Sequence, residues 1–184
     1  QPVIMLTPHC LGLDLGGTRL AASFDCVSIY ARQRDPVIDH WLFHGRSRFG
    51  SQVLLRRDES VRASIKAMKE MRPFYYLPDM DNGMEDSIFS PFFGVQAATL
   101  SALPRLTRLG GAVVVTCVTR MLPGGQGYVL TLSEPWTDFP SGNVEADVHR
   151  MNAAIEDLVR TMPAQYYWVH RRFKTRPPGE PKVY

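Results

Sequence analysis

Short hydrophobic runs alternate with amphipathic segments along most of the chain. The apolar and β-branched runs predict strands at residues 2–7, 26–31, 52–56, 73–79, 112–120 and 127–135. Segments with apolar residues three or four positions apart predict helices at residues 13–23, 35–50, 98–109 and 143–162, and one more that begins at Asp58. Because strands alternate with helices, we expect one α/β domain over residues 1–184, with a sheet flanked by helices on both faces.

Local signals support some of these helices better than others. Asp35 and Pro36 suit the first positions of the second helix, and Gly50 suits its end. In the helix after Asp58, one face is expected to carry Val61, Ile65 and Met68. Pro104 fits the interior of the helix at 98–109 poorly. The longest helix has an apolar stripe spaced by four and three residues: Val144, Val148, Met151, Ile155, Leu158 and Met162.

The composition fits a folded domain and excludes some classes of protein. Hydrophobic residues make up 45% of the chain and charged residues 21%, as in ordinary globular domains. The net charge of +3 is too small to indicate nucleic-acid binding, but it is compatible with an anionic lipid surface or an acidic protein partner. Three cysteines without paired spacing predict no disulfide framework, so we expect a reducing compartment. No apolar run reaches the roughly 18 residues of a membrane span.

The stretch TPHCLGLDLGGTRLAASFD, residues 7–25, fits two different chemistries. Its DLGGT portion, from Asp14, is similar to the phosphate-binding turn of sugar kinases and actin-like ATPases. That interpretation requires a β-hairpin whose backbone N–H groups surround a phosphate, and a second lobe for which the chain has no room. A lone Gly-Gly-Thr is also a weak signal, so this interpretation is a remote alternative.

The HCLGLD portion instead places an acid five residues after a histidine. On one continuous helix the two side chains would point about 140° apart, so they meet only if His9 lies in the turn before the helix and Asp14 inside it. The acid would then orient the imidazole, whose other nitrogen would take a proton from a substrate hydroxyl. A structural histidine–carboxylate pair has the same spacing. His9, Asp79 and Arg120 all follow or end predicted strands, where sites of open α/β sheets collect.

Six segments together resemble the lipid A biosynthesis acyltransferases, the lauroyl and myristoyl transferase family. They are HCLGLD (9–14), HGRSRFG (44–50), FYYLPDMDNG (74–83), SPFFGVQAAT (90–99), FPSGNVEAD (139–147) and QYYWVHRRFKTRPPGEP (165–181). They follow the family order through nearly the whole chain, and the last is long and specific. The resemblance implies a mixed sheet like that of the glycerolipid acyltransferases. It also implies a further N-terminal stretch with a membrane-anchoring helix, which is not among these 184 residues.

The resemblance implies an enzyme of lipopolysaccharide biosynthesis that moves a fatty acyl group from acyl carrier protein to a hydroxyl of a lipid A precursor. It places this enzyme at the cytoplasmic face of the inner membrane of a Gram-negative bacterium, with no cofactor, no metal and no nucleic acid as partner. His9 would be the general base and Asp14 its orienting partner. Arg46 would bind oxygen atoms of the substrate.

Three further residues are expected at the substrate-binding site. Asp79 and Asp81, in LPDMDNG, occupy a family motif and could orient Arg46 or cap neighbouring N–H groups. A metal site at this pair has no further ligands to support it. Arg120 ends a strand and is expected to face the same cleft. Arg46 and Arg120 have ordinary alternatives, as charges at a helix end and a strand end.

Other groups have less specific interpretations. Cys10 is expected to be a small buried side chain rather than a nucleophile. The apolar cluster Phe89, Phe92, Phe93 and Val95 suits the core, an acyl-chain wall or a membrane contact. The basic residues Arg171, Arg172, Lys174 and Arg176 suit lipid phosphates, an acidic carrier protein, a solvated tail or a structural contact. Four residues, Met80, Asn82, Gln96 and Thr116, depart from the family motifs, which bears on acyl-chain preference. A noncatalytic lipid-binding module of the same fold is the alternative function.

Overall fold

A six-stranded sheet forms the centre of the molecule. The computed structural model describes residues 1–56 and 60–184, and its sheet has the strand order β3-β2-β4-β1-β7-β8. The strands are β1 (Val3–Leu6), β2 (Val27–Tyr30), β3 (Val53–Arg56), β4 (Phe74–Tyr76), β7 (Val113–Met121) and β8 (Tyr128–Leu132). All neighbouring pairs are parallel except β7 and β8. The sheet is therefore mixed, as predicted, with an antiparallel strand at one edge.

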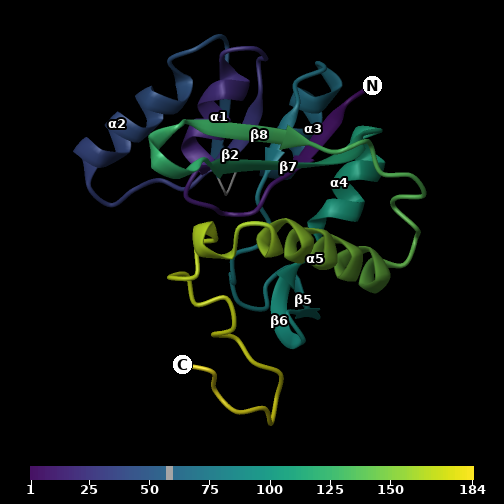
Figure 1. Ribbon diagram of the computed structural model, residues 1–184. Coiled ribbons are helices and arrows are strands. Elements are labelled where there is room, and N and C mark those ends of the chain that lie inside the picture. The colour runs from purple at the N-terminus through teal and green to yellow at the C-terminus, as the bar shows by residue number, and fades with distance from the viewer. Residues whose placement is uncertain (57–59) are drawn as a thin grey trace.

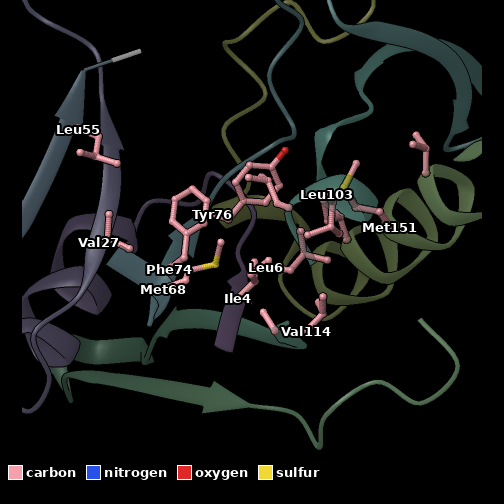
Figure 2. Packing of buried hydrophobic residues seen from close by; sticks show 14 of the residues in the cluster. Ile4, Leu6, Val27, Leu55, Met68, Phe74, Tyr76, Leu103, Val114 and Met151 are labelled. Carbon is pink, nitrogen blue, oxygen red and sulfur yellow. The ribbon is translucent and has the colours of Figure 1, made fainter. Parts of the chain in front are cut away.

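Helices cover both faces of this sheet. They are α1 (Leu13–Ala21), α2 (Pro36–Ser47), α3 (Ser60–Lys69), α4 (Ala102–Gly110) and α5 (Val144–Arg160). Successive residues of a strand point to opposite faces. On β1, Ile4 and Leu6 therefore pack in a core shared with α3, α4 and α5, whereas Met5 packs on the face covered by α1. Figure 2 shows the larger core, in which Phe74 of β4 and Met151 of α5 take part.

The predicted helix details are confirmed in part. The Asp35 carboxylate accepts the backbone N–H groups of Val37 and Ile38 at 2.8 and 3.1 Å, as an N-cap should. The middle of the α5 stripe is buried as predicted, but Val144 is exposed because it lies in the first turn. On α3, Met68 is buried and Val61 is exposed. The predicted helix start at Asp58 lies outside the described residues.

The prediction of a helix from Ala98 is wrong for its first residues. β5 (Ser87–Phe92) and β6 (Val95–Leu100) form an antiparallel hairpin that packs against α5, and Figure 1 shows it below that helix. The short run of apolar residues in β6 has no period that separates a strand from a helix. Helix α4 begins at Ala102, so Pro104 lies in the first turn, where its missing N–H costs nothing.

The DLGGT stretch belongs to helix α1 and forms no β-hairpin. Gly16 packs closely on β7, because a Cβ atom there would lie 2.0 Å from Oγ1 of Thr119. Gly12 approaches the same residue, with its Cβ position 2.8 Å from the Thr119 carbonyl oxygen. These glycines therefore allow a close contact between helix and strand. The kinase interpretation is wrong, since it requires a hairpin at this point.

The segment after α5 returns to the carboxyl ends of the strands and forms backbone hydrogen bonds with the loop after β1. The backbone N–H of Tyr167 donates to the His9 carbonyl at 3.0 Å, and that of Leu11 donates to the Gln165 carbonyl at 2.9 Å. Cys10 and Tyr166 form an isolated antiparallel bridge. Figure 1 shows the rest of this segment, in yellow, running past the β5–β6 hairpin.

Candidate active site

His9 and Asp79 form a hydrogen-bonded pair at the carboxyl edge of the sheet. The two residues follow β1 and β4, which are neighbouring parallel strands, so the loops that carry them meet. Nδ1 of His9 lies 2.6 Å from Oδ1 of Asp79, and the His9 backbone N–H donates to Oδ2 at 2.9 Å. An ionised carboxylate only accepts, so Nδ1 carries the proton and Nε2 keeps a lone pair. No hydrogen bond from the described part of the chain reaches Nε2.

Asp79 is almost completely buried, with 2% of its surface exposed. Burial alone would raise the pKa of this carboxyl group, but the hydrogen bonds and charge of His9 outweigh burial. A hydrogen bond with the Tyr166 hydroxyl acts in the same direction, and the net effect is a lowered pKa for Asp79. The group therefore stays ionised and can stabilise a protonated imidazole beside it.

Asp14 does not form the expected pair with His9. Within residues 1–56 and 60–184, no hydrogen bond or ion pair joins the two side chains. Oδ1 of Asp14 instead accepts from Nε and Nη2 of Arg46, at 2.9 and 2.8 Å. The physical reason is that Asp14 lies in the first turn of α1, beside the end of α2 that carries Arg46, while the imidazole is already held by Asp79. The carboxylate that contacts the imidazole in this structure is therefore Asp79, whereas the predicted Asp14 contacts Arg46.

A cleft of about 1030 Å³ contains His9, Asp14 and Arg46. It extends over the carboxyl ends of β2 and β4 and has walls on both faces of the sheet. Leu13, Leu20 and Tyr75 line it on the α1 face, and Tyr76, Leu100 and Leu106 line it on the face covered by α3 and α4. The site therefore combines a histidine and an arginine with walls that carry both apolar and polar side chains, which suit a substrate that has both a polar group and a hydrocarbon chain.

Of the expected substrate-binding residues, Asp79, Asp81 and Arg120 do not line this cleft. Asp81 is buried, and its carboxylate accepts from the backbone N–H groups of Gly83 and Thr175 and from the Thr175 hydroxyl, at 2.8–3.0 Å. Asp81 thus caps neighbouring N–H groups, which was one of its two expected roles. It also holds the C-terminal segment through Thr175. Arg120 is exposed near the end of β7, opposite Val129 of β8. The structure does not place Asp81 or Arg120 where it would bind a substrate in the cleft.

Residues of the C-terminal segment contact the loop after Asp79 and the β5–β6 hairpin, and the residue pattern alone did not assign them this role. Nε2 of His170 accepts the backbone N–H of Asp81 at 2.8 Å. Arg172 is fully buried, donates to the Ala98 carbonyl and the Thr99 hydroxyl, and lies over the Phe92 ring. Arg172 is therefore unable to meet lipid phosphates or a carrier protein. The only sequence signal was the long QYYWVHRRFKTRPPGEP motif.

The burial of Cys10 and of the phenylalanine cluster decides between their predicted roles. Cys10 is buried and donates to the Thr119 carbonyl, and burial raises the pKa of its thiol, so it is packed as a small side chain and is poorly suited to form a nucleophilic thiolate. Phe92 is fully buried in the larger core, against Phe93, Tyr166 and Phe173. The phenylalanine cluster does not line the cleft and is no acyl-chain wall there.

Comparison with known proteins agrees with this arrangement. A sequence profile described as "Bacterial lipid A biosynthesis acyltransferase" matches residues 1–175. The chain is 36% identical over 183 residues to the lipid A biosynthesis lauroyltransferase of Escherichia coli (strain K12), which covers 99% of this chain and 59% of the relative. It is 31% identical to the palmitoleoyltransferase of the same organism, with the same coverage, and 31% identical to its myristoyltransferase, with 100% and 57% covered.

The chain spans less than two thirds of the length of these relatives. The match nevertheless extends over nearly all of its own residues, including His9, Arg46 and Asp79. The chain therefore belongs to the bacterial lipid A biosynthesis acyltransferase family.

Proposed function

We propose that residues 1–184 are the catalytic domain of an enzyme that moves a fatty acyl group from the thioester of acyl carrier protein to a hydroxyl of a lipid A precursor. The observation that carries this proposal is the His9–Asp79 pair at a cleft with apolar walls, in a family whose named members transfer lauroyl, palmitoleoyl and myristoyl groups. Family membership alone supports acyl transfer in lipid A biosynthesis. The donor, the acceptor hydroxyl and the residue roles are part of the proposal.

His9 is the general base of the proposed reaction. Nε2 removes the proton of the acceptor hydroxyl while the hydroxyl oxygen attacks the thioester carbonyl carbon. The carbonyl becomes a tetrahedral oxyanion, which collapses, breaks the carbon–sulfur bond and forms the ester. The protonated imidazole then returns its proton to the departing thiolate. Asp79 holds the ring through Nδ1–H and stabilises the imidazolium in between, so no covalent enzyme intermediate is needed.

Arg46 is the substrate-binding cation of the proposed site. It faces the cleft, and Asp14 accepts from two of its nitrogens, which fixes the plane of the guanidinium. A guanidinium has five N–H donors, so several remain for the carbonyl oxygen of the thioester or for a phosphate of the acceptor. Asp14 therefore acts through Arg46 and is a positioning residue in this scheme.

We also propose that α2 lies against the cytoplasmic face of the inner membrane. The side chains of Val37, Ile38 and Trp41 on this helix are exposed, and Trp41 has 73% of its surface accessible. The exposed cations Arg34 and Arg48 flank the helix and suit anionic lipid head groups. No helix within the described ranges is both long and apolar enough to cross a bilayer. The apolar side chains of α2, the helix that also carries Arg46, would thus bring the site to a lipid substrate.

Transfer by purified wild-type protein and His9→Ala tests the proposal. The assay follows acyl transfer from acyl carrier protein to a lipid A precursor, with circular dichroism to confirm folding. We expect a loss of about 10³-fold or more for His9→Ala, because removal of a base usually costs at least this factor when a carboxylate supports it. His149→Ala is the matched control, since His149 is exposed on α5 and outside the cleft. Turnover by His9→Ala close to wild type would remove the base, and no turnover by wild type would favour the noncatalytic lipid-binding module.

A further inference from the structure

The hydroxyl of Tyr76 is a buried polar group without a partner at the wall of the cleft. Tyr76 ends β4 and is 4% exposed, and no hydrogen bond reaches its hydroxyl from any described residue. It is nevertheless among the residues that line the cleft. Figure 2 shows its ring in the larger core, and the ring centroid lies 5.3 Å from that of Phe74.

Such a hydroxyl destabilises the free protein, because it has lost its water and gained nothing in return. The preceding residue, Tyr75, shows how a buried tyrosine hydroxyl is usually paired. The Tyr75 hydroxyl, on the opposite face of β4, donates to the Leu13 carbonyl at 3.3 Å. Burial raises the pKa of Tyr76, so its hydroxyl stays protonated at any working pH and is able to donate. An unpaired donor at a cleft wall is the arrangement expected of a group that pairs with a ligand.

The surroundings of Tyr76 indicate the chemical class of that ligand. On the same face of the sheet, the cleft is lined mainly by the hydrocarbon side chains of Ile29, Leu100, Ala102 and Leu106, beside the polar residues Ser64, Ser101 and Arg105. A wholly polar ligand would lose its own hydrogen bonds at such a wall. A plain hydrocarbon chain would leave the tyrosine hydroxyl unpaired. A chain that carries one oxygen atom at the depth of Tyr76 satisfies both requirements.

We infer that Tyr76 is a specificity-determining residue that hydrogen-bonds an oxygen atom carried on an acyl chain of the substrate, a hydroxyl or an ester oxygen, in the arm of the cleft beneath α4. This inference rests on the proposed function in one respect, that the cleft holds acyl chains. His9 and Asp79 act on the reacting atoms, whereas Tyr76 distinguishes an oxygenated chain from a plain one. Its contribution is therefore to the choice of chain and not to proton transfer.

Binding to Tyr76→Phe tests the inference without any turnover. The probes are fatty acids of one chain length, unsubstituted or with a single hydroxyl at successive positions, and affinity is measured by calorimetry below the micelle concentration. For at least one position, we expect the preference of wild type for the hydroxylated chain over the plain chain to exceed that of Tyr76→Phe by about three- to tenfold, the net value of one hydrogen bond. The position that shows the preference gives the depth of Tyr76 along the chain.

Stability supplies a second measurement on the same variant. Without ligand, Tyr76→Phe should melt about 2–4 °C higher than wild type, because the unpaired hydroxyl is removed and the ring is kept. Tyr75→Phe, which loses a made hydrogen bond, should melt lower. Tyr128→Phe, exposed on β8 and away from the cleft, is the control for binding.

The outcomes separate this inference from the proposed function. Equal hydroxyl preference in wild type and Tyr76→Phe overturns the role of Tyr76 while acyl transfer through His9 stands. A lower melting temperature for Tyr76→Phe also contradicts it, because the hydroxyl would then have a partner such as a bound water. Failure of wild type to bind any fatty acid contradicts both the inference and an acyl-chain site in the cleft.

Discussion

Asp79 holds His9 at two atoms, the ring Nδ1 at 2.6 Å and the backbone N–H at 2.9 Å. The pair joins the ends of two neighbouring strands that are 70 residues apart in the chain. One contact sets the tautomer and rotation of the imidazole, and the other fixes the loop that carries it. An imidazole positioned in this way loses little freedom when a substrate binds, which is the advantage of a preorganised site.

Asp79→Asn should reduce kcat/KM by about 10²–10⁴-fold. An amide can donate to Nδ1, which would place the proton on Nε2 and leave no lone pair there to act as base, and the charge that stabilises the imidazolium is lost. The measurement is steady-state transfer together with its pH profile. Asp14→Asn is the matched control, since it removes the same charge from the carboxylate that does not touch His9. We expect its effect to be smaller and to fall mainly on KM. A larger loss for Asp14→Asn than for Asp79→Asn would restore Asp14 as the partner of the base.

Arg46 and Asp14 should be coupled in substrate binding. Arg46→Lys keeps the charge but loses the planar fork, so we expect KM to rise about tenfold, and Arg46→Ala to be worse. In Asp14→Asn the guanidinium is present but poorly oriented. The double variant with Arg46→Ala should therefore be no worse than Arg46→Ala alone. Kinetics with donor and acceptor varied separately identify which substrate Arg46 binds. Losses that simply multiply would show that Asp14 and Arg46 act independently.

The alternation of strands and helices was sufficient to predict the sheet, because the spacing of hydrophobic residues in each segment shows which of its faces is buried. It was insufficient for the hairpin of β5 and β6, where the Phe93–Gly94 turn has φ values of +49° and +76°. Nothing in the residue pattern of SPFFGVQAAT separates that turn from a loop before a helix. The local spacing of apolar residues does not show which strands pair with each other.

The sequence identified the residues of the candidate site but not which of them contact each other. His9 and Asp79 were both expected at strand ends, and parallel neighbours bring such ends together. Which acid meets the imidazole depends on strand order and on the direction of Asp14 in α1, and both are properties of the packed structure. The burial of Arg172 is a similar case, since a basic run is solvated in most proteins.

Gly16→Ala tests the helical assignment of DLGGT. The added Cβ would lie 2.0 Å from Oγ1 of Thr119, so we expect the free energy of unfolding to fall by about 1–3 kcal/mol. At Gly17 the nearest atom is Cε1 of Tyr75 at 3.7 Å, an ordinary contact. Gly17→Ala should thus be neutral, or stabilising by up to about 1 kcal/mol through helix propensity. Chemical denaturation measures both, and adding Thr119→Ala to Gly16→Ala should recover part of the loss. Equal effects at the two glycines would argue against the close contact with β7.

Trp41→Ser should weaken binding to vesicles of anionic phospholipid by about tenfold or more. A buried aromatic side chain contributes roughly 1.5–3 kcal/mol to transfer from water, and Trp41 is largely exposed in the structure. Its removal should not alter the fold, because α2 has no buried residues. Cosedimentation with vesicles is the measurement, and Tyr128→Ser, on exposed β8, is the control. Undiminished binding by Trp41→Ser would mean that another surface meets the membrane.

His170 should make the stability of the fold decrease in mild acid. Its Nε2 accepts the N–H of Asp81 at 2.8 Å, a contact that exists only while that nitrogen is unprotonated. Burial lowers the pKa of His170 below 6.5, and the nearby Lys174 adds to this, while Asp81 opposes it. The unfolded chain therefore binds the proton more readily than the folded one. The stabilisation is complete above pH 6.5 and is lost as the pH falls from there through the lower pKa of the folded state.

Urea denaturation from about pH 8 to about pH 5 should show this decline in wild type. His170→Gln, whose side-chain carbonyl accepts a hydrogen bond but does not titrate, should show a smaller decline. An equal decline in both proteins would assign the acid sensitivity to other groups.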